Sequence, residues 1–218
     1  MVFHIISIFP EFKAFDAYLG SSILGRAQKN KLFSVKLWNQ RDYSNNKWRK
    51  VDDKPYGGGP GMILAAEPIL RTVKKIVGKK TAPKVIVFSA QGKPFTNVVA
   101  RKLAAKKQDI IFVCGRYEGV DARVTKILKA EEYSIGDYIL TGGELPAMIA
   151  IDAIARHIPG VLGAGESIEE TRAASKEIYT RPDVLEWNGK KYRVPALLKA
   201  GNHAAIEAWR AKKSTHKK

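Results

Sequence analysis

The sequence has little cysteine, few acidic residues for its basic content, and no long apolar run. Its single cysteine, Cys114, cannot form an intramolecular disulfide, which is typical of a reducing compartment. No run approaches the roughly 18 apolar residues of a membrane-spanning helix. The residues before Pro10 also lack the basic segment that begins a signal peptide. We therefore expect a cytoplasmic protein with no membrane contact.

Several familiar catalytic motifs are missing as well. No Gly-x-Gly-x-x-Gly turn follows a strand pattern and no Gly-x-x-x-x-Gly-Lys-Ser/Thr loop occurs, which disfavours ordinary dinucleotide and P-loop enzymes. The four histidines show no metal-ligand spacing, and there is no Gly-x-Ser-x-Gly nucleophile elbow. We therefore expect neither a zinc site nor a hydrolytic triad, and we assign no metal ligand.

Basic residues dominate the charge of the chain. Lys and Arg number 38 against 21 Asp and Glu, which gives a formal net charge of +17 over 218 residues. An excess of this size on a globular chain indicates a polyanionic partner. Nucleic acid is the leading candidate, because no long basic amphipathic helix suited to a lipid surface is visible.

Strand-like and helix-like patterns alternate along most of the chain. The predicted strands are 3–9, 33–38, 84–88 and 110–114, and the predicted helices are 68–77, 96–107, 121–130 and 144–157. Pro68 suits a first helical turn, and Gly78 suits a helix end. This alternation predicts an α/β domain with a mainly parallel sheet.

The composition changes after the last of these helices. We predict a main domain over 1–162, a flexible linker over 163–178 that is rich in Gly, Ala, Ser and Glu, and a small, mostly helical C-terminal domain over 179–218. Within the last part, Asn188-Gly189 predicts a β-hairpin turn and Asn202 predicts a helix cap.

Glycine is concentrated in three segments, 56–61, 115–119 and 134–146. Ordered glycine carries an entropic cost, so clustered glycines indicate either turns with positive φ or a ligand lying where a Cβ atom would be. The recurrence of such segments favours the ligand over a plain turn.

Seven motifs, in the same order, resemble those of the bacterial tRNA (guanine-N1)-methyltransferases of the TrmD type. They are Val51-Asp52-Asp53 with 56–62, 113–119, 134–146, 158–162, 179–182 and Gly201-Asn202-His203. The match covers nearly the whole chain, and several long motifs in order are far more specific than any one glycine pattern.

The resemblance implies a SPOUT-type α/β fold whose C-terminal part forms a deep trefoil knot, an arrangement too rare to be proposed from sequence patterns. It implies S-adenosylmethionine as cofactor, an obligate homodimer with a shared active site, and the tRNA anticodon stem-loop as partner. The cofactor residues that it implies are Ser89, Ala90, Gly115, Tyr117, Glu118, Gly119, Ile135, Gly136, Asp137, Tyr138, Ile139, Leu140, Thr141, Gly142, Gly143 and Pro146. Ala90 stands where the family usually has proline.

The expected reaction needs a base and a cation. N1 of guanine carries a proton at neutral pH, so a carboxylate must remove it, and a guanidinium can stabilise the charge that develops on the exocyclic oxygen. The resemblance assigns Arg156 to the cation; the alternative is an ion pair with Asp152. For the base we choose Glu170, with Glu169 next, although both could simply begin a solvated helix.

The resemblance assigns substrate binding to Asp52, Gly61 and Arg156. It also associates the family with Mg²⁺, for which no dedicated ligand cluster is visible. Two alternatives stay open: an RNA-binding relative that lacks catalysis, and a knotted methyltransferase that acts on another RNA or another guanine atom.

Overall fold

The computed structural model describes residues 1–78, 83–163 and 177–213. The chain divides into two compact units, Met1–Gly163 and Ala164–Lys218. Most of the predicted linker, 164–176, lies outside the described residues. Among the helices that the structure describes, none is long and apolar enough to cross a membrane.

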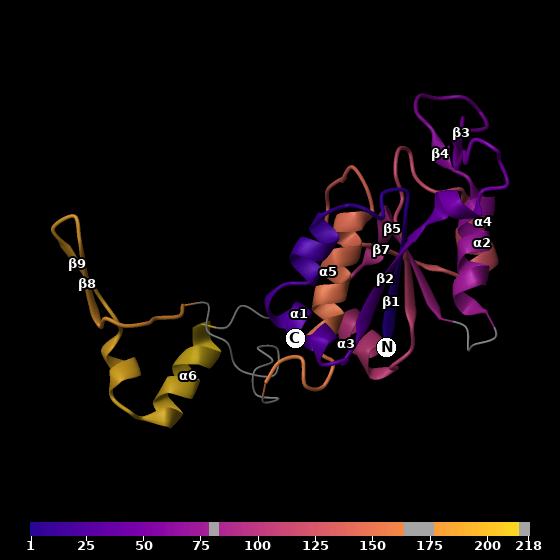
Figure 1. Ribbon diagram of the computed structural model, residues 1–218. Helices are drawn as coiled ribbons and strands as arrows, with labels where there is room; N and C mark the ends of the chain where they lie inside the picture. Colours follow the sequence, from indigo (N-terminus) through magenta and orange to yellow (C-terminus); the bar gives the residue numbers. More distant parts are fainter. Residues whose placement is uncertain (79–82, 164–176, 214–218) are drawn as a thin grey trace. The chain divides into compact units, whose positions relative to one another are not determined.

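A five-stranded parallel sheet forms the centre of the first unit (Figure 1). Its strands are β1 (Val2–Ser7), β2 (Ser34–Asn39), β5 (Lys84–Pro94), β6 (Ile110–Val113) and β7 (Glu131–Ser134). The order is β2-β1-β6-β5-β7, and every neighbouring pair is parallel. The predicted α/β class and parallel sheet are confirmed.

Four strands lie where the sequence predicts them, and the fifth, β7, was missed. β7 reads Glu-Glu-Tyr-Ser and lies at the sheet edge, where only Tyr133 is buried. β5 also continues beyond the predicted 84–88, because an irregularity between Phe88 and Lys93 interrupts its register with β7 without ending the strand.

Helices cover both faces of this sheet. They are α1 (Ser22–Lys29), α2 (Ala66–Val77), α3 (Asn97–Ala105), α4 (Ala122–Leu128) and α5 (Glu144–Ala155). One buried cluster unites α1, α3 and α5 with the sheet, and a second unites α2 and α4 with its other face. The predicted boundaries hold to within a few residues: Gly78 ends α2, and Thr96 caps α3 by accepting from the Val99 amide.

Three short elements lie outside this pattern. A π-helical segment, η1 (Phe15–Leu19), precedes α1, and a 3₁₀ segment, η2 (Gln40–Tyr43), follows β2. A small antiparallel pair, β3 (Asp52–Asp53) and β4 (Ile63–Leu64), frames the Tyr-Gly-Gly-Gly-Pro-Gly segment. We call residues 51–64 the β3–β4 hairpin.

The second unit contains β8 (Val184–Trp187), β9 (Lys190–Arg193), η5 (Ala196–Lys199) and α6 (His203–Lys213). Asn188 and Gly189 both have positive φ, of 51° and 72°, and they join β8 to β9 in a two-residue turn as predicted. The Asn202 side chain accepts a hydrogen bond from the Ala205 amide at 3.1 Å, which confirms the predicted cap of α6.

Candidate active site

Three segments meet at the carboxyl edge of the parallel sheet, where α/β proteins commonly bind ligands. They are the β5 segment (89–95), the β6 loop (114–121) and the β7 loop (135–143). The Gly143 amide donates to the Gly115 carbonyl at 2.9 Å, and the Phe95 amide donates to the Ser134 carbonyl at 2.7 Å. Every predicted cofactor residue except Pro146 lies in these segments, and Pro146 lies in the first turn of α5.

Close backbone packing explains two of the glycines here. A Cβ atom on Gly143 would lie 2.7 Å from Cys114 Cα, and one on Gly92 would lie 2.6 Å from the Tyr133 carbonyl carbon. Real Cβ atoms do not approach backbone so closely, so any larger residue would separate these segments. At Gly92 and Gly143 the close approach is therefore to the protein's own backbone.

A buried carboxylate ties the β6 loop to the start of α5, directly after the β7 loop. Glu144 is 2% exposed, accepts a hydrogen bond from Ser7 Oγ at 2.6 Å, and forms an ion pair with Arg116 Nε at 2.9 Å. Cys114 is buried in the core, and this burial, together with the weaker effect of the Glu144 charge, raises the pKa of its thiol well above the usual value. Sequence reasoning missed Glu144 and Ser7, because a carboxylate after Gly-Gly reads as an ordinary first-turn residue.

The β7 loop presents backbone and apolar groups to its surroundings. Ile139 is 87% exposed, and Tyr138 and Leu140 are partly exposed. The backbone amides of these three residues make no hydrogen bond to any other residue in the described ranges. Apolar side chains with available backbone donors suit a purine ring and its ribose.

The β3–β4 hairpin packs directly against the β6 loop. The Glu118 amide donates to the Met62 carbonyl at 3.0 Å, and the Leu64 amide donates to the Gly119 carbonyl at 3.0 Å. Gly61, with φ of 80°, lies so close that a Cβ atom would be 2.6 Å from Glu118 Oε1. Two predicted substrate residues, Asp52 and Gly61, therefore belong to an element that is tied to predicted cofactor residues.

Arg156 lies at the other end of α5 from the β7 loop. It is the C-cap residue, whereas Gly143 is the N-cap. The alternative pairing with Asp152 competes with another contact, since Asp152 Oδ2 accepts a hydrogen bond from Tyr18 Oη at 2.5 Å. The predicted bases, Glu169 and Glu170, lie outside the described residues.

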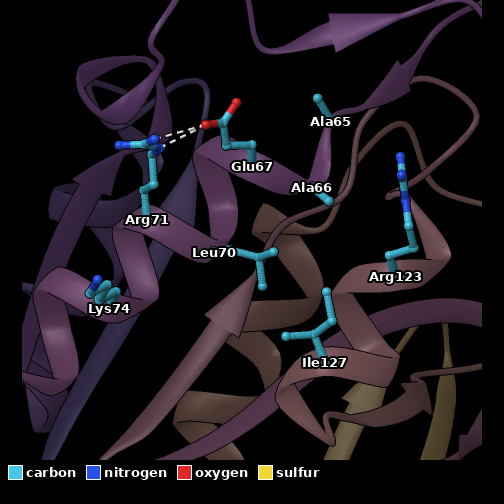
Figure 2. A pocket seen from close by; sticks show the side chains of 8 residues that line it. All are labelled: Ala65, Ala66, Glu67, Leu70, Arg71, Lys74, Arg123 and Ile127. Atoms are coloured by element: carbon cyan, nitrogen blue, oxygen red, sulfur yellow. Dashed lines mark hydrogen bonds and ion pairs between the residues drawn. The ribbon is translucent and has the colours of Figure 1, made fainter.

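A surface hollow lies between α2 and α4 (Figure 2). Its lining residues are Ala65, Ala66, Glu67, Leu70, Arg71, Lys74, Arg123 and Ile127, none of which the sequence singled out. No group of three or more His, Cys, Asp or Glu residues that could hold a metal ion occurs within the described ranges.

Comparison with known proteins places the chain in a family. The sequence profile described as "tRNA (Guanine-1)-methyltransferase TrmD" matches residues 1–218. A tRNA (guanine-N(1)-)-methyltransferase of Ruminiclostridium cellulolyticum is 46% identical over 219 residues, covering 98% of this chain and 91% of that protein. Enzymes of the same name from Clostridioides difficile and Vibrio cholerae are 44% and 46% identical, over 98% and 96% of this chain and 92% and 84% of theirs. The chain therefore belongs to the TrmD family of tRNA (guanine-N1)-methyltransferases.

Proposed function

We propose that this enzyme methylates N1 of the guanosine directly 3′ of the tRNA anticodon, position 37, with S-adenosylmethionine as the methyl donor. The observation that carries the proposal is the contact of Gly61 with Glu118. It joins the hairpin expected to bind the substrate to a loop expected to bind the cofactor. Family membership supports the tRNA substrate and the guanine-N1 chemistry.

The β7 loop fits S-adenosylmethionine. The amides of Tyr138, Ile139 and Leu140 can donate to the adenine and ribose, and the apolar side chains of the loop can pack on the ring. When bound, the cofactor would supply an electrophilic methyl group and would leave as S-adenosylhomocysteine. The Glu144–Arg116 ion pair holds the β6 and β7 loops together around that position.

Other residues would remove the guanine N1 proton and stabilise the charge that develops on the base. Guanine N1 must lose its proton as it forms the new bond to the methyl carbon, and Glu170, or Glu169 next to it, would take that proton. The guanidinium of Arg156 would stabilise the negative charge that develops on the exocyclic oxygen. Any Mg²⁺ requirement of the family would be met without a dedicated protein site.

The position of Arg156 favours an active site shared between two subunits. The twelve residues of α5 lie between Gly143 and Arg156, and at 1.5 Å per residue the helix is about 18 Å long. An arginine side chain spans only part of that distance, which supports a site that Arg156 reaches from another subunit. A homodimer would bring Arg156 of one subunit to the cofactor loop of the other.

Exposed apolar side chains provide a surface for such a dimer. Leu145 and Ile149 lie one turn apart on α5 and are 49% and 40% exposed. Phe12, Tyr18 and Ile23 are also partly exposed, on or beside η1 and α1. An apolar surface of this kind on a highly charged chain marks a protein interface. Family resemblance adds the proposal that the C-terminal part of the α/β domain forms a deep trefoil knot.

The test is methyl transfer by the purified protein to an unmodified tRNA transcript, with labelled S-adenosylmethionine. Transfer to a transcript with guanosine 3′ of the anticodon, and none after its replacement by adenosine, is the expected result. No transfer to any tRNA, with tRNA binding intact, would favour the alternative of an RNA-binding relative. Transfer that ignores the replacement would favour an enzyme for another nucleotide.

A further inference from the structure

Two hollows on the outer face of α2 form a single basic surface. The hollow of Figure 2 lies between α2 and α4, and a second lies between α2 and the end of η2. Both are lined by Arg71 and Lys74, so they adjoin along the helix. We call this surface the α2 groove; its other charged lining residues are Asp42, Glu67, Lys75 and Arg123.

Cations exceed the available carboxylates in the α2 groove. Glu67 is already bound to Arg71, whose Nη2 lies 2.9 Å from Glu67 Oε1, and Asp42 is paired with Arg49. Lys74 and Lys75 have no ion pair with any other residue that the structure describes, and both are exposed. The groove therefore presents uncompensated positive charge, which suits an anionic ligand.

The floor of the groove is apolar. Leu70 of α2 and Ile127 of α4 face each other across it in Figure 2, and Ile127 is 59% exposed. Arg123, on the α4 side, forms a bidentate pair with Asp121, in which Nε donates to Oδ1 and Nη2 donates to Oδ2. Cations flanking an apolar strip match a ribose–phosphate chain, because the phosphates are anionic and the sugars have apolar faces.

The groove continues from the β3–β4 hairpin. α2 begins directly after β4, the Ala65 amide donates to the Val51 carbonyl at 2.8 Å, and Asn45 Nδ2 donates to Glu67 Oε1 at 2.9 Å. One end of the groove is therefore tied to the element that carries Asp52. A polymer bound at the hairpin would extend along α2 without a gap.

An exposed aromatic residue lies on the β3–β4 hairpin, to which the α2 groove is joined. The Tyr56 side chain, on the hairpin, is fully exposed. Asp121 chiefly, and Tyr56 to a lesser degree, raise the pKa of the Arg123 guanidinium. Exposed aromatic side chains beside cations are the usual means of stacking on unpaired bases.

We propose that the α2 groove binds the ribose–phosphate backbone of the tRNA anticodon arm next to the methylated nucleotide. This inference rests on the proposed function, because it takes tRNA as the substrate. Lys74 and Lys75 contact phosphates, and the strip formed by Leu70 and Ile127 lies under the sugars.

A matched pair of double variants tests the proposal in the full-length protein. K74A/K75A removes two adjacent lysines from α2, and R101A/K102A removes two adjacent, exposed cations from α3 on the other face of the sheet. Alanine is a good helix former, so both variants should fold, as circular dichroism can verify. Affinity is measured for full tRNA and for an isolated anticodon stem-loop over a range of salt concentrations.

K74A/K75A should weaken binding of both RNAs by about tenfold and reduce the slope of log K against log salt by about 1 to 2. R101A/K102A should change binding of either RNA by less than about twofold. Equal affinities and slopes for the two variants would overturn the proposal, as would a loss for full tRNA that is absent with the stem-loop. If the wild type fails to methylate tRNA, the proposed function fails instead.

Discussion

Arg116 Nε lies 2.9 Å from Glu144 Oε2, and this ion pair fastens the β6 loop to the start of α5. The Glu144 side chain is 2% exposed and that of Arg116 is 21% exposed, so removal of either partner leaves a largely buried charge without its counter-ion. The pair therefore connects the stability of the sheet edge with the shape of the proposed cofactor site.

We expect Glu144→Gln to lower the free energy of unfolding by about 1–3 kcal/mol. Glutamine can still accept from Ser7 but cannot neutralise Arg116. The affinity for S-adenosylmethionine should fall as well, since the two loops would no longer be held in place. Thermal unfolding and calorimetry measure both effects, with Glu132→Gln on the exposed side of β7 as the control. A melting temperature equal to that of the control would show that the Glu144–Arg116 ion pair does not stabilise the fold.

Tyr133 gives the protein a specific sensitivity to alkali. Burial, followed by its hydrogen bond to Glu131, raises the pKa of Tyr133 from 10.0 to about 12. Below pH 10 the phenol is neutral in both states, but between pH 10 and 12 the unfolded chain loses its proton first, so stability falls as pH rises.

Tyr133→Phe should remove this pH-dependent part of the free energy of unfolding, which amounts to at most about 2–3 kcal/mol. Urea unfolding of wild type and variant at several pH values between neutrality and 12 measures it. The two stability curves should converge in alkali. Curves that stay parallel throughout would show that Tyr133 ionisation does not contribute.

Sequence patterns predicted the elements whose burial is regular. Strands such as β6, buried at every position, and helices with clear ends, such as α2 before Gly78, were found close to their true limits. β7 was not found, because Glu131 and Glu132 dominate a four-residue edge strand whose only deeply buried residue is Tyr133. Propensity says little about such a strand, since its partner β5 determines it.

The candidate site was predictable only in part. The glycine segments could be recognised from the sequence. The contacts that Gly61 makes with Glu118, and Gly143 with Cys114, could not, because they join segments that are distant in the sequence. The same holds for Glu144, whose partners Ser7 and Arg116 lie far from it in the sequence. The α2 groove had no sequence signal, because its lysines read as an ordinary solvated helix face.

The proposed shared active site predicts complementation between two inactive variants. Arg156→Ala should slow methyl transfer by about 10²- to 10³-fold without loss of cofactor affinity. Gly136→Val should abolish cofactor binding, because the added side chain would collide with the Tyr138 ring in the β7 loop. In a heterodimer of the two, one site keeps an intact loop from one subunit and Arg156 from the other.

Unfolding and refolding the two variants together in equal amounts should therefore restore roughly a quarter of the wild-type activity. Half of the dimers would be mixed, and each would hold one competent site. Each variant refolded alone is the control. Activity in the mixture no higher than in the controls would place Arg156 and the cofactor loop of one subunit in the same site.

The identity of the base can be settled by two isosteric changes. Glu170→Gln keeps the shape of the side chain and removes its basicity, so the single-turnover rate should fall by about 10²- to 10⁴-fold with cofactor affinity unchanged. If the rate of this variant is near normal and that of Glu169→Gln falls by a similar factor, Glu169 is the general base. If both variants react normally while Arg156→Ala does not, neither glutamate removes the proton.

The position and atom of methylation test the central claim most directly. After reaction with S-adenosylmethionine, the tRNA is cut into defined fragments, and the methylated nucleoside is identified by mass spectrometry against methylguanosine standards. We predict 1-methylguanosine, confined to the fragment that carries the nucleotide directly 3′ of the anticodon. A different methylguanosine, or 1-methylguanosine in another fragment, would contradict the account.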